Sequence, residues 1–306
     1  MPDDNTIAEQ RVPNPIVRFA PSPNGLLHVG HARSAMLNWR FADTRGGTFL
    51  LRIEDIDVTR ARPEFEAAIM QDLAWLGIKW PKPVRRQSEH FAEYQTALEE
   101  LRRLGLLYPA FLSRAEITAL VSEFESTGGV WPRDPDGAPH YPDTDRALSD
   151  AERTRRIAAG DPHAWRLDMQ AALNGLGRKL SWTESGAGPK GETGRIEADP
   201  GAWGDVTLAR RDVPASYHLC VTVDDAVQSI TDVIRGEDLF ASTSVHRLLQ
   251  HLLGLPVPAY YHHGLVRDHN ARKLSKSDGA TSIAALRREG ASPADILALA
   301  GLADAD

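Results

Sequence analysis

Two histidines separated by Val-Gly stand near the start of the chain. The segment HVGH carries His28 and His31, and it follows a short apolar run at 15–20 and the loop-forming residues Pro21-Ser22-Pro23-Asn24-Gly25. This order predicts a strand, a loop and then a helix that begins near the histidines. Gly30 would let a phosphate approach the helix N-terminus, where imidazole N–H groups can bind its oxygens. The motif predicts a phosphate site; the alternative is that one histidine caps the helix while the other packs.

Two lysines occur together late in the chain. Lys273 and Lys276 belong to the segment KLSKS, whose neighbours include Asp268, Asn270 and Gly279. Lysines on such a loop can close over a triphosphate and stabilise a phosphoryl group during its transfer. Taken alone, the segment fits an exposed basic loop as well.

Strand and helix patterns alternate after the histidine motif. Apolar spacing predicts a helix at 31–43, a near-continuous apolar strand at 48–57, a helix that begins at Pro63, and another helix at about 88–104. Strands and helices that alternate at this spacing indicate parallel βαβ units.

The alternation fades between about 108 and 205, where glycines and prolines are frequent, and this predicts an inserted subdomain that is partly loop. Apolar runs return farther on, at 205–212 and 216–226, followed by a predicted strand at 230–236, a helix near 239–253 and a strand near 258–266. The expected fold is therefore α/β, with a Rossmann-like parallel-sheet nucleotide-binding core that is interrupted by an inserted α+β subdomain. The predicted divisions are 1–107, 108–205 and 206–306, the last with the lysine segment and a short C-terminal helical segment.

The composition is that of an ordinary globular protein. The 306 residues are 42% hydrophobic and 25% charged, and no apolar run is long enough for a transmembrane helix. The acidic, polar N-terminus does not have the pattern of a secretory signal. A single cysteine, Cys220, excludes an internal disulfide framework and a thiolate-rich zinc or iron–sulfur site. A cytoplasmic location with no membrane partner is expected, and the net charge of −7 argues against a general binder of nucleic acid.

Together, the histidine and lysine motifs resemble the signature of class I aminoacyl-tRNA synthetases. The segments RFAPSPNGLLHVGHAR, LLRIEDID, DVIRGEDL and KLSKS are similar to the glutamyl branch, over about 16–106 and 205–280. The resemblance implies that glutamate is activated by ATP, bound with Mg²⁺, and that pyrophosphate leaves. It implies that His28, His31, Lys273 and Lys276 stabilise charge on the phosphates, and that His28, Gly30, His31 and Lys276 contact ATP.

A glutamate pocket must supply cations for two carboxylates and an anion for one ammonium group. Arg18, Glu54 and Arg235 stand at the ends of predicted strands, so the three side chains can converge at the edge of a parallel sheet. The resemblance implies a larger set of amino-acid contacts, namely Arg18, Phe19, Ala20, Pro21, Ser22, Glu54, Tyr217 and Arg235. Which arginine takes the γ-carboxylate stays open, and each arginine alone also fits an ordinary ion pair.

The chain departs from the glutamyl pattern where many such enzymes bind zinc. The positions of three expected cysteines are occupied by Ala110, Leu112 and Asp145. Zinc is therefore not expected, and no metal site is predicted. The alternative is a site for a hard metal at His140 and Asp145.

The second departure concerns length, since only 29 residues follow Ser277. The chain thus resembles the truncated glutamyl-queuosine tRNA(Asp) synthetases, which lack an anticodon-binding domain. This resemblance implies activation of L-glutamate without tRNA and its transfer to queuosine in the anticodon loop of tRNA(Asp). Two alternatives stay open: a minimal glutamyl-tRNA synthetase that charges the 3′ end of tRNA(Glu), and a non-catalytic tRNA-binding paralogue.

The RNA-binding surface is only loosely indicated. The candidates are four basic clusters and four tryptophans, namely Arg85-Arg86, Arg153 with Arg155 and Arg156, Arg210-Arg211, Arg287-Arg288, Trp131, Trp165, Trp182 and Trp203. The alternative is that the arginines form solvated faces and the tryptophans pack in the insert. A monomer is expected.

Overall fold

Strands and helices alternate through the first third of the chain. The computed structural model describes residues 14–266 and 281–303. The first elements are β1 (Ile16–Phe19), α1 (Val29–Asp43), β2 (Thr48–Ile53), α2 (Pro63–Trp75) and β3 (Arg85–Arg86). β1 pairs with β2 and β2 with β3, all in parallel, so the carboxyl ends of β1 and β2 lie side by side. The apolar sequences of β1 and β2 suit strands that are covered on both faces.

β2 ends earlier than its apolar run and acidic tail predict. The strand stops at Ile53, and the amide of Glu54 donates to the carbonyl of Pro21 at 3.1 Å. This hydrogen bond holds the loop after β1 against the end of β2. The side chain of Glu54 is therefore placed at the sheet edge, beside that loop.

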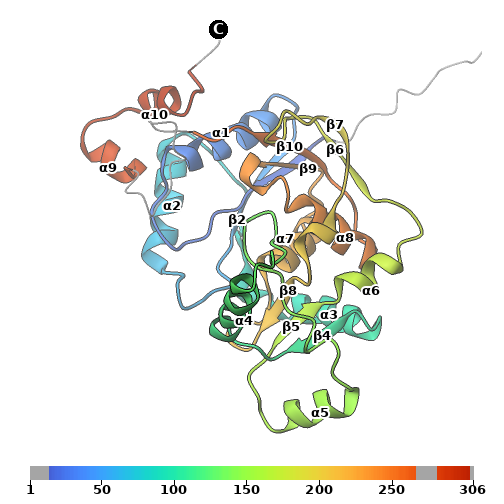
Figure 1. Ribbon diagram of the computed structural model, residues 1–306. Coiled ribbons are helices and arrows are strands. Elements are labelled where there is room, and N and C mark those ends of the chain that lie inside the picture. Colours follow the sequence, from blue (N-terminus) through green and yellow to red (C-terminus); the bar gives the residue numbers. More distant parts are fainter. Residues whose placement is uncertain (1–13, 267–280, 304–306) are drawn as a thin grey trace, which may run out of the picture.

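A second set of parallel strands completes the core. It contains α7 (Tyr217–Val227), β9 (Asp232–Gly236), the short 3-10 helix η3 (Glu237–Leu239), α8 (Thr243–Leu252) and β10 (Ala259–His263). β9 and β10 are parallel, and the amide of Thr231 donates to the carbonyl of Ile16 at 2.9 Å beside β1. Hydrogen bonds thus place the strands in the order β3-β2-β1-β9-β10 across the core, of which β2, β9 and β10 are labelled in Figure 1. The predicted α/β fold with a Rossmann-like parallel core is confirmed.

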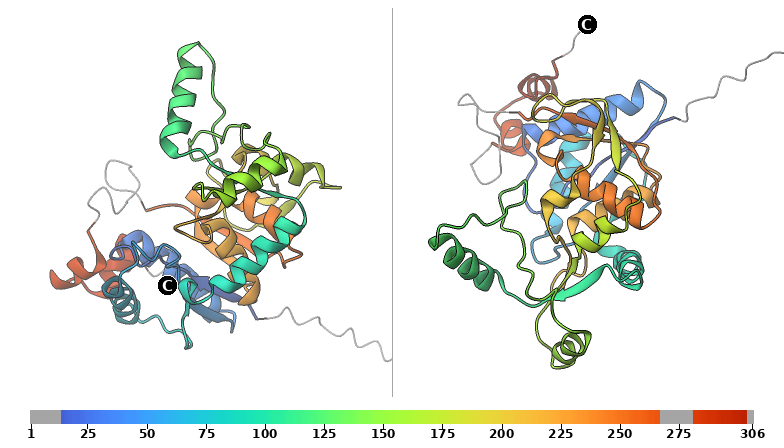
Figure 2. Two further views of the ribbon diagram at one scale, coloured as in Figure 1. Left: turned by 90° about the horizontal axis from the view of Figure 1, so that it is seen from below. Right: turned by 45° about the vertical axis from the view of Figure 1, so that its right-hand side comes forward.

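The middle of the chain builds a separate antiparallel sheet. Its strands are β4 (Leu107–Ala110), β5 (Ala164–Leu167) and β8 (Thr207–Arg210). The helices of this region are α3 (Phe91–Arg103), α4 (Arg114–Ser126), α5 (Asp150–Ala158) and α6 (Met169–Asn174). α4 stands out from the rest of the molecule in both views of Figure 2.

Part of the predicted insert extends the core sheet. β6 (Ser181–Glu184) pairs in parallel with β10, and β7 (Gly194–Glu197) pairs with β6 as an antiparallel edge strand. The division at 108–205 stays a prediction. β6 and β7 lie within that range of the sequence, but in the structure they belong to the core sheet. The pairing places the end of β6 next to β10.

Two short helices follow the undescribed segment 267–280. They are α9 (Ile283–Arg288) and α10 (Pro293–Leu299), and they lie beside α1 and α2 (Figure 1). Ile283 and Ile296 are buried in the same apolar cluster as Val17 of β1. Among the described residues, no helix is long and apolar enough to cross a membrane.

Candidate active site

A cavity of about 650 Å³ opens at the carboxyl ends of β1, β2 and β9. Its wall comes from the loop after β1, the first turns of α1 and α7, the end of β2 and the segments after β9 and β10. The predicted site residues among the described part of the chain all line it, namely Arg18, Phe19, Ala20, Pro21, Ser22, His28, Gly30, His31, Glu54, Tyr217 and Arg235. Lys273 and Lys276 lie outside the described residues.

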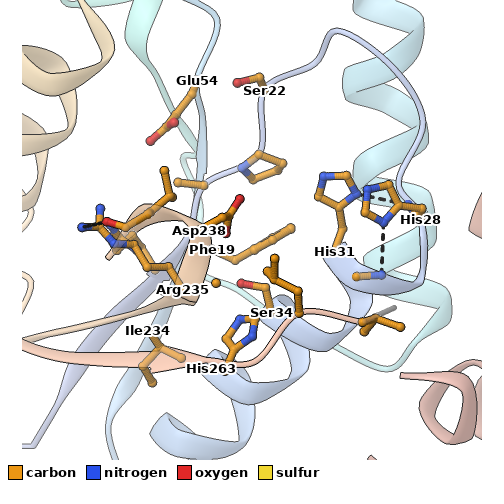
Figure 3. Close-up of a pocket in the computed structure, with 18 of the residues that line it drawn as sticks. Phe19, Ser22, His28, His31, Ser34, Glu54, Ile234, Arg235, Asp238 and His263 are labelled. Carbon is orange, nitrogen blue, oxygen red and sulfur yellow. Dashed lines mark hydrogen bonds between the residues drawn. The ribbon is translucent and has the colours of Figure 1, made fainter. Parts of the chain in front are cut away.

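The two histidines lie at one end of the cavity, and Arg235 and Glu54 lie at the other (Figure 3). The N-terminus of α1 therefore faces one end of the cavity, and an arginine and a carboxylate face the other. This separation suits a ligand with a phosphate portion and an amino-acid portion.

His28 and His31 form a reciprocal cap on α1. The amide of Gly30 donates to Nδ1 of His28 at 3.1 Å, and the amide of His28 donates to Nδ1 of His31 at 3.1 Å. Each Nδ1 is thus an acceptor, so the ring hydrogen of each neutral imidazole is on Nε2. The cap and the cavity wall use the same two side chains, and capping does not exclude phosphate binding.

Gly30 is required by this cap. A Cβ atom at this position would lie 2.9 Å from Cε1 of His28 and 3.1 Å from its Nδ1. Any side chain would push the His28 ring away from the amide that it caps. The glycine of the motif therefore has a steric role in the cap, and its contact with phosphate stays a prediction.

Arg18 at the end of β1 is neutralised by a buried partner. Its Nε and Nη2 donate to the two oxygens of Asp225 on α7 at 2.9 and 3.2 Å. Burial raises the pKa of Asp225, but the charges of Arg18 and Arg52 outweigh burial and leave it below its ordinary value. Asp225 is thus ionised, and it holds the Arg18 side chain at the cavity wall.

Arg52 of β2 links Asp225 to Glu54. This fully buried side chain donates from Nη1 to Asp225 at 2.8 Å and from Nη2 to Glu54 at 3.1 Å. Burial raises the pKa of Glu54, and the charges of Arg52 and Arg18 offset that rise only in part. An ammonium group beside Glu54 would favour the ionised carboxylate.

The sequence interpretation missed Arg52, Asp224 and Asp225. Asp224 accepts hydrogen bonds from Arg85 at 2.8 Å and Tyr94 at 2.9 Å, so it ties α7 to β3 and α3. The available signal was the occurrence of charged residues inside apolar runs, LLRIE and CVTVDD, since buried charges are normally paired.

Arg235, at the end of β9, differs from Arg18 because it has no bonded carboxylate in the described part of the chain. It is only 4% exposed, yet it makes no ion pair with any described residue. Its nitrogens donate to neutral groups, which are His262 Nε2 at 3.1 Å, Thr243 Oγ1 at 2.8 Å, His246 Nδ1 at 3.3 Å and the Leu239 carbonyl at 3.1 Å. Because none of these acceptors is an anion, the positive charge of Arg235 is not balanced by a bonded carboxylate, and an anionic ligand could pair with it.

Two neutral histidines continue the network behind Arg235. His246 Nε2 lies 3.1 Å from Nδ1 of His218, and both rings pack against Tyr217. Burial, followed by the charge of Arg235, lowers the pKa of His218 to about 4 and lowers that of His246 as well. Burial also raises the pKa of the Tyr217 phenol, which lines the cavity as a neutral donor.

The residues at the expected zinc position do not fit zinc. Ala110 and Leu112 offer no side-chain ligand, and one Asp145 oxygen accepts hydrogen bonds from the Phe111 amide at 2.6 Å and from the Tyr141 hydroxyl. The Nε2 atom of His140 is 3.0 Å from the Ala202 carbonyl, so it acts as a donor there. Within the described ranges, no group of three metal-ligating side chains occurs.

Several residues considered for RNA contact have other partners. Arg85 pairs with Asp224 and with Glu93, at 2.8 and 2.6 Å, and Arg86 pairs with Glu66 at 2.6 Å. Among the four tryptophans, Trp182 and Trp203 are buried, and Trp131 and Trp165 are partly exposed. Trp182 packs against Tyr260 in the core sheet and not in the predicted insert.

Comparisons with known proteins agree with this geometry. Residues 16–303 match the family described as tRNA synthetases class I (E and Q), catalytic domain. A protein of Rhodobacter capsulatus named glutamyl-Q tRNA(Asp) synthetase is 48% identical, and the match covers 94% of this chain and 100% of that protein. A glutamate–tRNA ligase of Prochlorococcus marinus is 38% identical, with 87% of this chain and 53% of the relative covered.

Solved structures show the same fold. Glutamate-tRNA synthetase from Elizabethkingia anophelis matches with a TM-score of 0.77 and 29% identity, covering 94% of this chain. The chain spans about three fifths of that structure's length and about half of the Prochlorococcus relative. The cavity with its capped histidine motif, the parallel core and the match over 16–303 lead to one assignment: the chain belongs to the class I tRNA synthetase family for glutamate and glutamine, as a catalytic domain of that family.

Proposed function

We propose that this protein activates L-glutamate with ATP, without tRNA, and transfers the glutamyl group to queuosine in the anticodon loop of tRNA(Asp). The observation that carries the activation step is the state of Arg235, a buried cation at the cavity wall with no carboxylate partner among the described residues. A ligand carboxylate would supply the missing negative charge. Arg18 and Glu54, at the same cavity, suit the other charged groups of an amino acid.

The placement of the two ends of the cavity favours Arg235 for the γ-carboxylate. The α-carboxylate must reach the α-phosphorus, so it has to point towards the phosphate end, where His28 and His31 lie. Arg235 is at the other end, and the carboxylate that it holds is therefore the one that does not react. Glu54 would then bind the ammonium group, and Tyr217 would donate a hydrogen bond to the substrate.

The proposed activation step is an in-line displacement. An oxygen of the α-carboxylate bonds to the α-phosphorus of ATP, the bond to the bridging oxygen breaks, and pyrophosphate leaves with that electron pair. The Nε2–H groups of His28 and His31 bind phosphate oxygens as charge develops on them. Lys273 and Lys276 are proposed to act on the same phosphates, and the described residues that flank their segment, Val266 and Ser282, lie at the cavity wall and beside His28.

Enzymes of this class use ATP together with Mg²⁺. Such an ion takes most of its ligands from phosphate oxygens and water, with one or two protein carboxylates. The cavity wall offers the carboxylate of Asp238, so the residues present fit an ion that arrives with ATP. No zinc is proposed, because the residues at 110–112 and 141–145 are joined by hydrogen bonds instead.

The proposed acceptor is a hydroxyl of the queuosine ring. Its oxygen attacks the carbonyl carbon of the glutamyl-adenylate, the bond from that carbon to the phosphate oxygen breaks, AMP leaves with the electron pair, and the hydroxyl proton passes to water. The product is an ester. The support for this acceptor is the relative named glutamyl-Q tRNA(Asp) synthetase, which matches this chain over its whole length with higher identity than the glutamate–tRNA ligase does. We place the reaction in the cytoplasm, with the protein acting as a monomer.

The second candidate is a synthetase that charges the 3′ end of tRNA(Glu). It is favoured by the printed names of the Prochlorococcus relative and the Elizabethkingia structure. Acylation with labelled glutamate separates the two, using tRNA(Asp) with queuosine, tRNA(Asp) from cells that cannot make queuosine, and tRNA(Glu). An alkali-labile product on the first RNA alone supports our proposal, and charging of tRNA(Glu) would establish the second candidate.

A further inference from the structure

A buried carboxylate lies one imidazole ring behind Arg235. Glu184, at the end of β6, is 2% exposed and accepts hydrogen bonds on both oxygens. Oε1 accepts from the amides of His262 and Gly186, at 2.8 and 2.9 Å. Oε2 lies 2.6 Å from Nδ1 of His262 and accepts from the indole of Trp182 at 3.3 Å. Three of the four groups that face Glu184, the two amides and the indole, can only donate.

This set of donors fixes the tautomer of His262. Burial raises the pKa of Glu184, but the hydrogen bonds from the His262 ring and backbone outweigh it and leave the pKa lowered. Since an ionised carboxylate only accepts, Nδ1 of His262 must carry the hydrogen. Nε2 is then a lone pair, and it accepts from Nε of Arg235 at 3.1 Å. The chain of contacts runs from carboxylate to imidazole to guanidinium.

The surrounding structure leaves the His262 ring little freedom. The ring stacks parallel to Tyr260, with centroids 6.0 Å apart, and meets the edge of Phe240 at 5.2 Å. Close approach of the neighbouring backbone also depends on Gly186, because a Cβ there would lie 2.3 Å from the His262 carbonyl oxygen. The geometry that joins Glu184 to Arg235 is thus set by packing on several sides.

The indirect contact has an electrostatic consequence. A carboxylate bonded directly to Arg235 would neutralise it, as Asp225 does for Arg18. Glu184 instead orients the guanidinium through a neutral ring and leaves Arg235 without a directly bonded carboxylate among the described residues. A neutral amide placed there would leave a buried charge unpaired, whereas a carboxylate would pair with it.

We propose that Glu184, acting through His262, is a positioning residue that makes Arg235 select glutamate over glutamine. This inference rests on the proposed function, because it assigns a specificity device to the same cavity. Neither side chain is needed to touch the substrate. Glu184 fixes the His262 ring, and Nε2 of that ring accepts from Nε of Arg235. The guanidinium is thereby held in place with no carboxylate of the described chain bonded to it, so that it can pair with the ligand.

Glu184→Gln tests this role with almost no change in size. The amide nitrogen of the new residue must face either the two backbone amides or the His262 ring. In the second case Nδ1 of His262 becomes the acceptor, the ring hydrogen moves to Nε2, and it points at the N–H of Arg235. Two donors then face each other, so Arg235 must move or lose its hydrogen bond.

The experiment is ATP–pyrophosphate exchange with glutamate or glutamine, without tRNA, in the wild type and four variants. Glu184→Gln and His262→Leu break the contact chain, and His262→Gln keeps both a donor and an acceptor. Glu197→Gln, an exposed glutamate on the adjacent strand β7, is the matched control. In Glu184→Gln and His262→Leu we expect KM for glutamate to rise about ten- to a hundredfold and the preference for glutamate over glutamine to fall similarly.

KM for ATP should stay within about twofold in these variants, since Arg235 lies away from the histidine end. Glu197→Gln should stay near wild type, and His262→Gln should recover most of the glutamate preference that His262→Leu loses. Histidine ¹⁵N NMR gives an independent readout, with the hydrogen of His262 on Nδ1 in the wild type and on Nε2 in Glu184→Gln.

An unchanged glutamate preference in Glu184→Gln and His262→Leu, with normal wild-type exchange, would overturn the inference alone. Equal rises in KM for ATP and for glutamate would also overturn it, because they indicate general damage to the cavity. No glutamate-dependent exchange in the wild type would overturn the proposed function and this specificity role together.

Discussion

At the scale of single residues, the cavity contains two arginines in opposite electrostatic states. Arg18 is bonded through two nitrogens to Asp225, whereas Arg235 is held only by neutral groups. An arginine with a buried counter-ion is fixed in place, and the counter-ion weakens its attraction for a ligand carboxylate. The arginine without one gains more from an incoming carboxylate, so we expect it to dominate recognition of the γ-carboxylate.

Arg235→Leu should therefore weaken glutamate use far more than ATP binding. The loss of a buried, hydrogen-bonded charge partner corresponds to about 2–5 kcal/mol. Steady-state exchange kinetics would show this as a large rise in KM for glutamate with KM for ATP little changed. Arg102→Leu, which removes an exposed arginine of α3, serves as the control. If KM for glutamate is the same in Arg235→Leu and the control, Arg235 is a structural residue only.

Lys276→Ala is expected to abolish exchange, a prediction that comes from the sequence motif. Removal of one group that stabilises transition-state charge corresponds to about 3–4 kcal/mol in comparable sites. Circular dichroism should show an intact fold, and Lys190→Ala, at an exposed lysine, should keep full activity. Exchange within a few-fold of the wild type would remove Lys276 from the proposed mechanism.

The residues of the cavity wall could be predicted where their position in the sequence marks a strand end. Arg18, Glu54 and Arg235 each stand at or just after an apolar run, and the structure brings all three to one cavity. Asp225 and Glu184 could not be placed in this way. Their partners are distant in sequence, Arg18 by 207 residues and His262 by 78, so only the folded chain reveals the pairing.

At the scale of elements, hydrogen bonds join the segments 110–112 and 141–145, where the sequence pattern departs from the expected zinc ligands. The Tyr141 hydroxyl accepts from the Leu112 amide at 2.9 Å and donates to Asp145, which also accepts from the Phe111 amide. These contacts tie the end of β4 to the loop at 141–145. Tyr141 and Asp145 are both buried, so their hydrogen bonds are shielded from water.

Tyr141→Phe should therefore destabilise the protein by about 1–3 kcal/mol, because the Leu112 amide loses its acceptor and Asp145 loses one of its donors. The measurement is the free energy of unfolding in urea. Tyr261→Phe, at a tyrosine whose hydroxyl makes no hydrogen bond with the described residues, is the matched control and should change little.

A chelator should leave the melting temperature of the wild type unchanged, since zinc is not proposed to hold these segments together. Metal analysis of the purified protein checks the same point. Stoichiometric zinc that survives the chelator, together with normal stability of Tyr141→Phe, would contradict this account of the region.

The elements of the parallel core were predictable because apolar runs and helix patterns alternate there. The middle of the chain was not, since frequent glycines and prolines hide its short strands. The pairing of β6 with β10 joins Glu184 to a strand that begins at Ala259, and no local pattern signals such a contact.

At the scale of the whole molecule, burial of histidines makes stability depend on pH. The pKa of His218 is lowered to about 4, and the pKa values of His246, His262 and His263 are lowered as well, in each case chiefly by burial. The folded protein thus holds these rings neutral at a pH where the unfolded chain would bind protons. Two of them, His246 and His262, are bonded directly to Arg235.

The sign of the effect follows from proton binding. Between pH 6.5 and 4 the unfolded chain binds more protons at His218 than the folded protein does, so the free energy of unfolding falls as pH falls through this window. At pH 4, His218 alone lowers the free energy of unfolding by about 3 kcal/mol relative to neutral pH. Urea unfolding at several pH values should show a shallower slope for His218→Gln than for the wild type. His251→Gln, at an exposed histidine of α8, is the control and should keep the wild-type slope. If His218→Gln also keeps the wild-type slope, His218 is not a buried neutral ring.

The family was predictable from two short motifs and the strand ends between them, because those residues carry the shared chemistry. The match over 16–303 confirms that assignment and extends it through the middle stretch, where the sequence resemblance was poor. The acceptor of the glutamyl group could not be predicted from the site, because no residue of the described cavity identifies it.

The central claim is that this cavity activates glutamate by itself, and ATP–pyrophosphate exchange tests it most directly. The assay contains purified protein, Mg²⁺, ATP, labelled pyrophosphate and one amino acid, with all RNA removed by nuclease. We predict exchange that depends on L-glutamate, proceeds without tRNA, and is much weaker with glutamine or aspartate. Exchange that appears only when tRNA is added, or that prefers glutamine, would contradict the account.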